Sequence, residues 1–296
     1  NVRLDVPLSA GPAYGASGIL VFGTADGQII ALSAQTGEER WRQPVGSEVL
    51  APPAVSSGVI VFRSIDGRLR GLATQTGREL WTVEQALPAL TLRGDTAPVI
   101  AGQIVLSGFD NGRVGAYELT TGNTLWEFPI ATPTGTNELE RLVDIGAGLV
   151  VVGNDVYTAG VRGRAVGIEI NTGFLLWQHE ISSYAGIGVD VNNVYVTDEF
   201  GAIVALTRRG GALVWRQEAL RLRDVTAPAR FGNALVVGDF EGYLHWLDPT
   251  DGRFLARARA ASDRITGAPL VVGQTIYVQG DDGTVAAFAI RNDESA

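Results

Sequence analysis

The sequence contains no cysteine, no methionine and no lysine, and only two histidines among its 296 residues. Without cysteine, the chain has no disulfide, no thiol nucleophile and no zinc–thiolate site. All 23 basic residues are arginine, and the formal net charge is −9. Nucleic acids and anionic lipid headgroups both select clustered positive charge, so this acidic balance argues against either as a partner. No apolar run reaches the roughly 18 residues of a membrane-spanning helix.

Glycine and short apolar segments are what the sequence has in abundance. It contains 38 Gly and 12 Pro, and 46% of its residues are hydrophobic. Apolar and polar residues alternate in short runs that are separated by turn residues, and this pattern is typical of many short strands. The composition therefore predicts an all-β fold with enough apolar residues for a large core.

A Gly-x-x-x-Trp unit recurs along the chain. Its copies are Gly37–Trp41, Gly77–Trp81, Gly122–Trp126, Gly173–Trp177 and Gly211–Trp215. A sixth copy starts at Gly252 with Ala256 in the place of Trp, and a seventh unit starts at Gly283 and stops before that place. Each unit reads as four short strands, with a tight turn such as Asp66-Gly67 between the second and third. Four strands in about forty residues predict a blade of a β-propeller.

We therefore expect one β-propeller domain over residues 1–296, built from four-stranded antiparallel blades, of which seven units are visible. A large ring at the start of each outer strand is expected to pack between neighbouring blades. Trp246 lies outside this register, on a third strand, and we expect it to pack as well. Residues 2–6 either supply the outer strand that the last unit lacks or form the tail of an upstream blade.

Two neighbouring connections between units are longer than the others. They are residues 86–95 and residues 132–144. Both follow an outer strand and precede the next inner strand, so both are expected on one face of the propeller. Together they carry Leu90, Leu92 and Leu142 beside Arg93, Arg141, Glu138, Glu140 and Asp144. Apolar anchors with charges around them are typical of a protein-binding patch. The alternative is that the two loops cap the ring and bury their own leucines.

Catalytic and metal-binding patterns are not evident in the sequence. His179 and His245 stand in no metal-ligand or triad spacing, and both are expected to be ordinary strand residues. Aspartates recur near the same turn of successive units, where Asp is favoured for turn chemistry. We therefore predict no metal, no cofactor and no catalytic residue.

The repeat units resemble those of the pyrroloquinoline-quinone (PQQ)-like repeat propellers, with an Ala-Leu third strand followed by Thr-Gly-x-x-x-Trp. Longer strings are similar to the BamB family, the propeller lipoproteins of the machine that assembles outer-membrane β-barrels. These strings are Leu90-Thr91-Leu92-Arg93-Gly94, Asp110-Asn111-Gly112-Arg113-Val114, residues 138–144, residues 236–246 and Asp251-Gly252-Arg253-Phe254. The resemblance covers nearly the whole chain.

The resemblance implies a non-catalytic, eight-bladed periplasmic protein, so the first blade is expected to be mostly missing from this chain. It implies a lipid anchor on an N-terminal cysteine that this chain lacks. The implied partner is BamA, which inserts outer-membrane proteins, contacted through its periplasmic POTRA domains. The family's contact residues correspond to Leu90, Leu92, Arg93 and Asp144. A second acidic residue of the family is Gly146 here, and Glu138 or Glu140 is a candidate to compensate.

Two other functions are compatible with the repeat. A quinoprotein dehydrogenase that uses PQQ and calcium shares the blade motif, but such enzymes need a central acidic metal site, and many carry a vicinal disulfide. The chain has no cysteine and no evident convergent carboxylates, so we favour the scaffold. A propeller that binds extended strands of unfolded outer-membrane proteins by edge pairing is compatible with the scaffold role.

Overall fold

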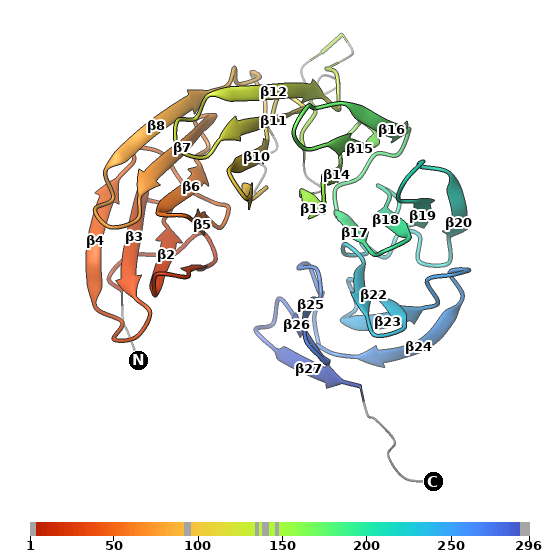
Figure 1. Ribbon diagram of the computed structural model, residues 1–296. Coiled ribbons are helices and arrows are strands. Elements are labelled where there is room, and N and C mark those ends of the chain that lie inside the picture. Colours follow the sequence, from red (N-terminus) through yellow and green to blue (C-terminus); the bar gives the residue numbers. More distant parts are fainter. Residues whose placement is uncertain (1–3, 92–95, 134–135, 138–141, 146–147, 291–296) are drawn as a thin grey trace. The chain divides into compact units, whose positions relative to one another are not determined.

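The computed structural model describes residues 4–91, 96–133, 136–137, 142–145 and 148–290, and Figure 1 labels their strands in chain order. Every helix or strand assigned within these residues is a β-strand. No helix in the described part of the chain is long and apolar enough to cross a lipid bilayer. The chain divides into two compact units, Asn1–Val156 with Glu169–Phe174 (unit 1) and Tyr157–Ile168 with Leu175–Ala296 (unit 2).

Three complete four-stranded sheets belong to unit 1. The first contains β1 (Ala13–Gly15), β2 (Ile19–Gly23), β3 (Gln28–Ser33) and β4 (Glu39–Pro44). The second contains β5 (Ala54–Ser56), β6 (Val59–Arg63), β7 (Arg68–Ala73) and β8 (Glu79–Glu84). The third contains β9 (Val99–Ala101), β10 (Ile104–Gly108), β11 (Arg113–Glu118) and β12 (Thr124–Pro129).

The fourth sheet has residues in both units, and the last three sheets belong to unit 2. The fourth contains β13 (Val150–Val152), β14 (Asp155–Ala159), β15 (Ala165–Glu169) and β16 (Leu175–His179). The fifth contains β17 (Ile187–Val189), β18 (Asn193–Thr197), β19 (Ile203–Thr207) and β20 (Leu213–Gln217). The sixth contains β21 (Ala229–Phe231), β22 (Ala234–Gly238), β23 (Tyr243–Leu247) and β24 (Phe254–Arg259). The seventh contains β25 (Leu270–Val272), β26 (Thr275–Gln279) and β27 (Val285–Ala289).

Each sheet is a meander in which successive strands pair, antiparallel wherever a register is defined. The second-to-third turns contain the glycines that the sequence indicated, and Gly67 and Gly112 have φ values of 78° and 75°. The Asp66 carboxylate accepts the backbone N–H of Arg68, so the aspartate completes the turn as expected. Positive φ is accessible to Gly at little cost, which explains the Asp-Gly pattern of these turns.

The core lies between successive sheets, and the middle strands supply most of it. All five residues of β6 are buried, whereas four of the six residues of the outer strand β8 are exposed. One apolar cluster joins Val21 and Ile29 of the first sheet to Ile60 and Phe62 of the second. A single sheet of this size buries too little apolar surface to be stable alone, so each sheet depends on its neighbours.

A hydrogen bond from each repeated tryptophan connects its sheet to the next one. The indole N–H of Trp81 donates to the carbonyl of Leu119 at 2.8 Å, and the ring lies against Gly122 in the same turn. Trp41, Trp126, Trp177 and Trp215 make the same bond to Thr74, Ile170, Arg208 and Pro249. The expected packing between blades is thus confirmed. This packing also explains the Gly-x-x-x-Trp motif, because the glycine of each repeat accommodates the tryptophan of the preceding repeat.

In the sixth sheet, the tryptophan that packs against the next sheet comes from the third strand and not from the outer strand. In the five sheets with a repeated Trp, that residue pairs with a small residue on the third strand, as Trp81 does with Gly71. In the sixth sheet, Trp246 on the third strand pairs with Ala256 on the outer strand, so large and small are exchanged. Trp246 packs edge-to-face on Phe288 of the seventh sheet, with ring centroids 5.6 Å apart. The expectation that Trp246 is a packing residue is confirmed.

The predictions about the ends of the chain are only partly accessible. Residues 1–3 lie outside the described residues, and Leu4, Asp5 and Val6 form no strand. The seventh sheet has three strands within the described residues. Both interpretations of residues 2–6 therefore stay predictions, as does the single domain over residues 1–296.

Candidate partner-binding site

The two long connections leave the outer strands of the second and third sheets. The first joins β8 to β9, and the second joins β12 to β13. The hydroxyl of Thr96, near the end of the first, donates to the carbonyl of Ile145, near the end of the second. Thr96 is buried and Ile145 is fully buried. This bond fixes the ends of the two connections to one another, in agreement with their expected positions at adjacent junctions.

Gln85 begins the first connection, and side chains of the third sheet hold it. Its side-chain nitrogen donates to the carboxylate of Glu127 and, at 3.3 Å, to the Tyr117 hydroxyl. Its side-chain oxygen accepts from Asn111 Nδ2 at 3.1 Å. Burial, reinforced by the Glu127 carboxylate, raises the pKa of Tyr117, so the hydroxyl stays protonated and donates to Glu127 at 3.1 Å. These contacts therefore hold the first residue of the connection against the third sheet.

A buried ion pair connects the second and third sheets. Arg63 at the end of β6 contacts Asp110 in the β10–β11 turn, with Nη2 2.9 Å from Oδ1. The Arg63 Nη1 atom also donates to the Gly108 carbonyl at 2.8 Å. Removing either partner would leave an uncompensated buried charge, which is strongly destabilising. The pair therefore holds the second and third sheets, which carry the first connection, in a defined arrangement.

Leu90 and Asp144 are the two predicted contact residues within the described chain, and their environments differ. The Leu90 side chain is 39% exposed, and the nearby Leu87 is also exposed. Asp144 is 1% exposed, between buried Val143 and Ile145. Its Oδ1 atom accepts the backbone N–H of Ile145 at 2.7 Å. The Asp144 carboxylate is thus buried in the protein, whereas Leu90 presents apolar surface to solvent.

The remaining predicted contact residues are Leu92, Arg93, Glu138, Glu140 and Arg141. All five lie outside the described residues. The combined patch of apolar anchors and charges therefore stays a prediction.

The described chain offers no arrangement for a metal ion. Over the described ranges, no group of three or more His, Asp or Glu side chains is placed to hold one. The turn aspartate Asp198 is engaged in its own turn and accepts the N–H groups of Phe200 and Ala202, at 2.9 and 2.8 Å. Asp239 likewise accepts the N–H groups of Glu241 and Tyr243 in its own turn, whereas Asp110 pairs with Arg63 of the neighbouring sheet.

His245 belongs to a polar network that sequence spacing did not reveal. Its Nε2 atom lies 2.8 Å from Asp239 Oδ2, which also accepts from Arg223 Nε at 2.8 Å. Burial alone would raise the pKa of Asp239, but hydrogen bonds from His245, Tyr243 N–H and Arg223 hold it below its ordinary value. The three side chains come from a connection, a turn and a strand, so only the fold brings them together. His179, in contrast, is the strand residue that was expected, at the end of β16.

A family model described as outer membrane protein assembly factor BamB matches residues 1–217 and 199–294. The chain is 42% identical over 208 residues to the BamB of Pseudomonas aeruginosa, a match that covers 70% of this chain and 55% of that protein. It is 41% identical over 284 residues to the BamB of Xanthomonas campestris pv. campestris, covering 96% of this chain and 70% of that protein. The matched segments thus cover 55% and 70% of the lengths of these two relatives.

The crystal structure of BamB from Moraxella catarrhalis is similar to this fold, with a TM-score of 0.90 and 28% sequence identity. The match covers 97% of this chain and 86% of that one. Together with the seven antiparallel sheets of the described residues, it confirms the predicted fold class, an all-β propeller of four-stranded blades.

Proposed function

Because this chain belongs to the family of outer membrane protein assembly factor BamB, we propose that it is a non-catalytic subunit of the machinery that assembles β-barrel proteins in the bacterial outer membrane. The observation that carries the proposal is the match of the family model along almost the whole chain. In this role the protein works at the periplasmic face of the outer membrane, tethered there by a lipid anchor. Its activity is binding.

The partner that we propose is the periplasmic POTRA region of BamA, bound by the two long connections. Leu90 offers an exposed apolar side chain, and the Thr96–Ile145 bond and the Gln85 contacts hold the ends of these connections. A loop that is anchored at its ends loses less conformational entropy on binding than an unanchored one. Leu92 and Arg93 would complete the contact on the first connection. On the second, Glu138, Glu140 and Arg141 supply charge, and Asp144 is a positioning residue.

The test is a pull-down of the BamA periplasmic domains with wild type and Arg93→Glu. We expect the charge reversal to abolish co-purification while the thermal unfolding midpoint stays unchanged. Arg78→Glu is the matched control, because Arg78 is an exposed arginine in the β7–β8 turn, away from both connections. Binding by Arg93→Glu at the wild-type level would refute the site, and the absence of binding by wild type would refute the partner.

A second measurement separates the scaffold from a quinoprotein. The protein is incubated with PQQ and calcium, and reduction of an electron-accepting dye is followed with primary alcohols as substrates. We expect no turnover above the protein-free control. Sustained dye reduction that depends on PQQ would contradict the non-catalytic role.

A further inference from the structure

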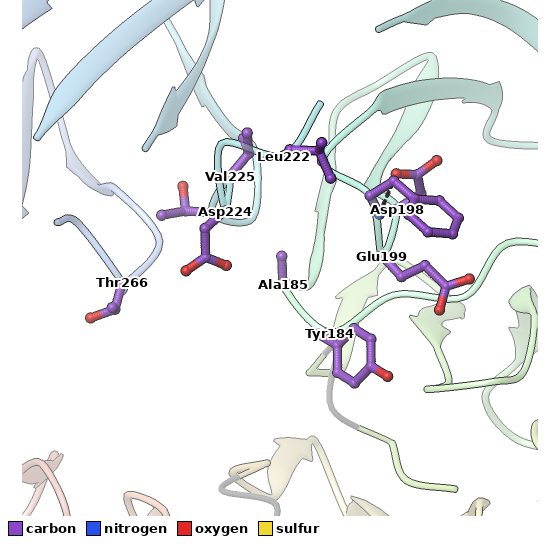
Figure 2. A pocket seen from close by; sticks show the side chains of 11 residues that line it. Tyr184, Ala185, Asp198, Glu199, Leu222, Asp224, Val225 and Thr266 are labelled. Carbon is purple, nitrogen blue, oxygen red and sulfur yellow. Dashed lines mark hydrogen bonds between the residues drawn. The ribbon is translucent and has the colours of Figure 1, made fainter. Parts of the chain in front are cut away.

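A pocket in unit 2 lies far along the chain from the two long connections. Its volume is about 480 Å³, and the β18–β19 turn lines it together with parts of the preceding and following connections. Figure 2 shows the side chains that surround it, among them Tyr184, Glu199, Leu222 and Asp224. No step of the proposed function uses these residues.

Apolar side chains are exposed at the rim of this pocket. Tyr184 is 50% exposed, Phe200 is 48% exposed and Leu222 is 81% exposed. In the other six repeats, the residue before the glycine of the second-to-third turn is polar or charged: Asp26, Asp66, Asn111, Arg162, Glu241 and Asp282. Phe200 therefore places an apolar side chain at a position where the other repeats have a polar one. Grouped exposed apolar side chains with polar surroundings are typical of a protein-binding site.

Hydrogen bonds between the loops fix the apolar rim. The backbone N–H of Leu222 donates to the carbonyl of Phe200 at 2.8 Å, and that of Glu199 donates to the carbonyl of Ser182 at 3.0 Å. The guanidinium group of Arg221 lies 5.4 Å from the centroid of the Phe200 ring. The rim is thus organised before a ligand arrives, which lowers the entropic cost of binding.

The lining of the pocket is acidic. It includes the carboxylates of Asp198, Glu199 and Asp224, and none of its residues is basic. Arg216 pairs with Asp198 at 2.5 Å, and Arg264 pairs with Asp224 at 3.8 Å. Figure 2 shows Glu199 and Asp224 on either side of Ala185. Glu199 accepts a hydrogen bond from the Ser182 hydroxyl, which carries no charge. Among the described residues that line the pocket, Glu199 is thus the carboxylate without an ion pair.

We propose that this pocket docks a segment of a partner protein in which an arginine or lysine neighbours an apolar side chain. The cation pairs with Glu199, and the apolar side chain packs on the rim formed by Tyr184, Phe200 and Leu222. Charge complementarity selects the cation, and burial of the exposed rim supplies affinity. This docking surface is independent of the contact proposed for the two long connections.

The test uses three capped heptapeptides, Gly-Ser-Leu-X-Phe-Ser-Gly, in which X is Arg, Gln or Glu. Binding to the whole chain is followed by nuclear magnetic resonance of the methyl groups of Leu222 and Val225, both of which line the pocket. We expect saturable shifts with the Arg peptide, at least about fivefold weaker binding with the Gln peptide, and none with the Glu peptide. Added salt weakens the Arg peptide most. Equal shifts with all three peptides would overturn the proposal.

Variants locate the site. Phe200→Ser and Glu199→Gln should each weaken the binding of the Arg peptide at least about fivefold. Phe174→Ser is the matched control, because Phe174 is 68% exposed in the β15–β16 turn and does not line the pocket. It should bind the peptide like wild type. Arg93→Glu should also bind normally, which separates this pocket from the BamA contact. Undiminished binding by Phe200→Ser would refute the docking surface.

Discussion

The sixth sheet and the five sheets before it build the layer between blades in two different ways. In the five, a tryptophan on the outer strand covers a small residue on the third strand and donates a hydrogen bond to the next sheet, as Trp81 does above Gly71. In the sixth, Trp246 on the third strand pairs with Ala256 and packs edge-to-face on Phe288 of the seventh sheet. The same space is thus filled from either strand, so the volume of the pair matters more than which residue is large.

The largest loss in the free energy of unfolding is expected when one of the hydrogen-bonding tryptophans is removed. Trp81→Ala deletes a buried ring and its bond to Leu119, and should lower the free energy of unfolding by about 3–5 kcal/mol. Trp246→Ala should cost about 2 kcal/mol, because that ring is only half-buried. Urea denaturation followed by circular dichroism measures both. Equal losses would show that neither the deeper burial of Trp81 nor its hydrogen bond adds to stability.

The next largest effect concerns the glycine that accommodates each tryptophan. Gly122 has φ of 71° and lies against the Trp81 ring, whereas Gly58 has φ of 81° with open space around it. Gly58→Ala carries only the strain of positive φ and should cost about 1 kcal/mol. Gly122→Ala adds the clash and should cost roughly 2–3 kcal/mol. The difference between the two unfolding free energies isolates the tryptophan contact. Identical losses would mean that the ring moves away freely.

The exchange in the sixth sheet is tested by reversing it. Trp246→Ala alone leaves two alanines in the pair, so a void remains next to Phe288. Adding Ala256→Trp restores the arrangement of the other sheets and should recover about 1 kcal/mol of the loss. Ala256→Trp in the presence of Trp246 places two rings in one pair and should not stabilise the protein. If the double variant were no more stable than Trp246→Ala, the two strands would not be equivalent.

Much of this architecture could be predicted from the sequence, because its signals are local. The turn sequence Asp66-Gly67 and the short apolar run from Val59 to Phe62 act within a few residues, and both predict the strands observed. Trp246 was placed on a third strand from its position alone. The exchange of the large and the small residue between Trp246 and Ala256 was not predicted. It depends on which residues pair across the two strands, and the spacing of the repeat does not determine that register.

The candidate sites were less predictable than the fold. Leu90 is exposed, as an apolar anchor for a partner must be, and its role in binding stays a prediction. The burial of Asp144 was not expected, because it depends on contacts of Val143 and Ile145 that no spacing encodes. Phe200 carried a signal that was overlooked, since it is the one aromatic residue among the residues that precede the turn glycines.

The smallest effect sharpens the comparison through pH. Tyr195 on β18 packs beside Trp215 in the fifth sheet, with the rings tilted and their centroids 5.9 Å apart, whereas Val236 holds that position in the sixth. Burial raises the pKa of Tyr195 above its ordinary value of 10.0, and hydrogen bonding to Asp190 adds to this. The folded protein thus keeps a proton that the unfolded chain releases above that pH, so this contribution to stability is present below pH 10 and declines above it.

Tyr195→Phe should make the unfolding free energy fall less steeply between pH 9 and 11, measured by urea denaturation at each pH. Tyr14→Phe is the control, because Tyr14 is an exposed tyrosine on β1. It should leave the slope unchanged, since this side chain remains in water when the protein folds. An unchanged slope in Tyr195→Phe would mean that the hydroxyl already ionises in the folded protein. The layer between blades would then tolerate a charge beside Trp215, and the contrast with the sixth sheet would rest on volume alone.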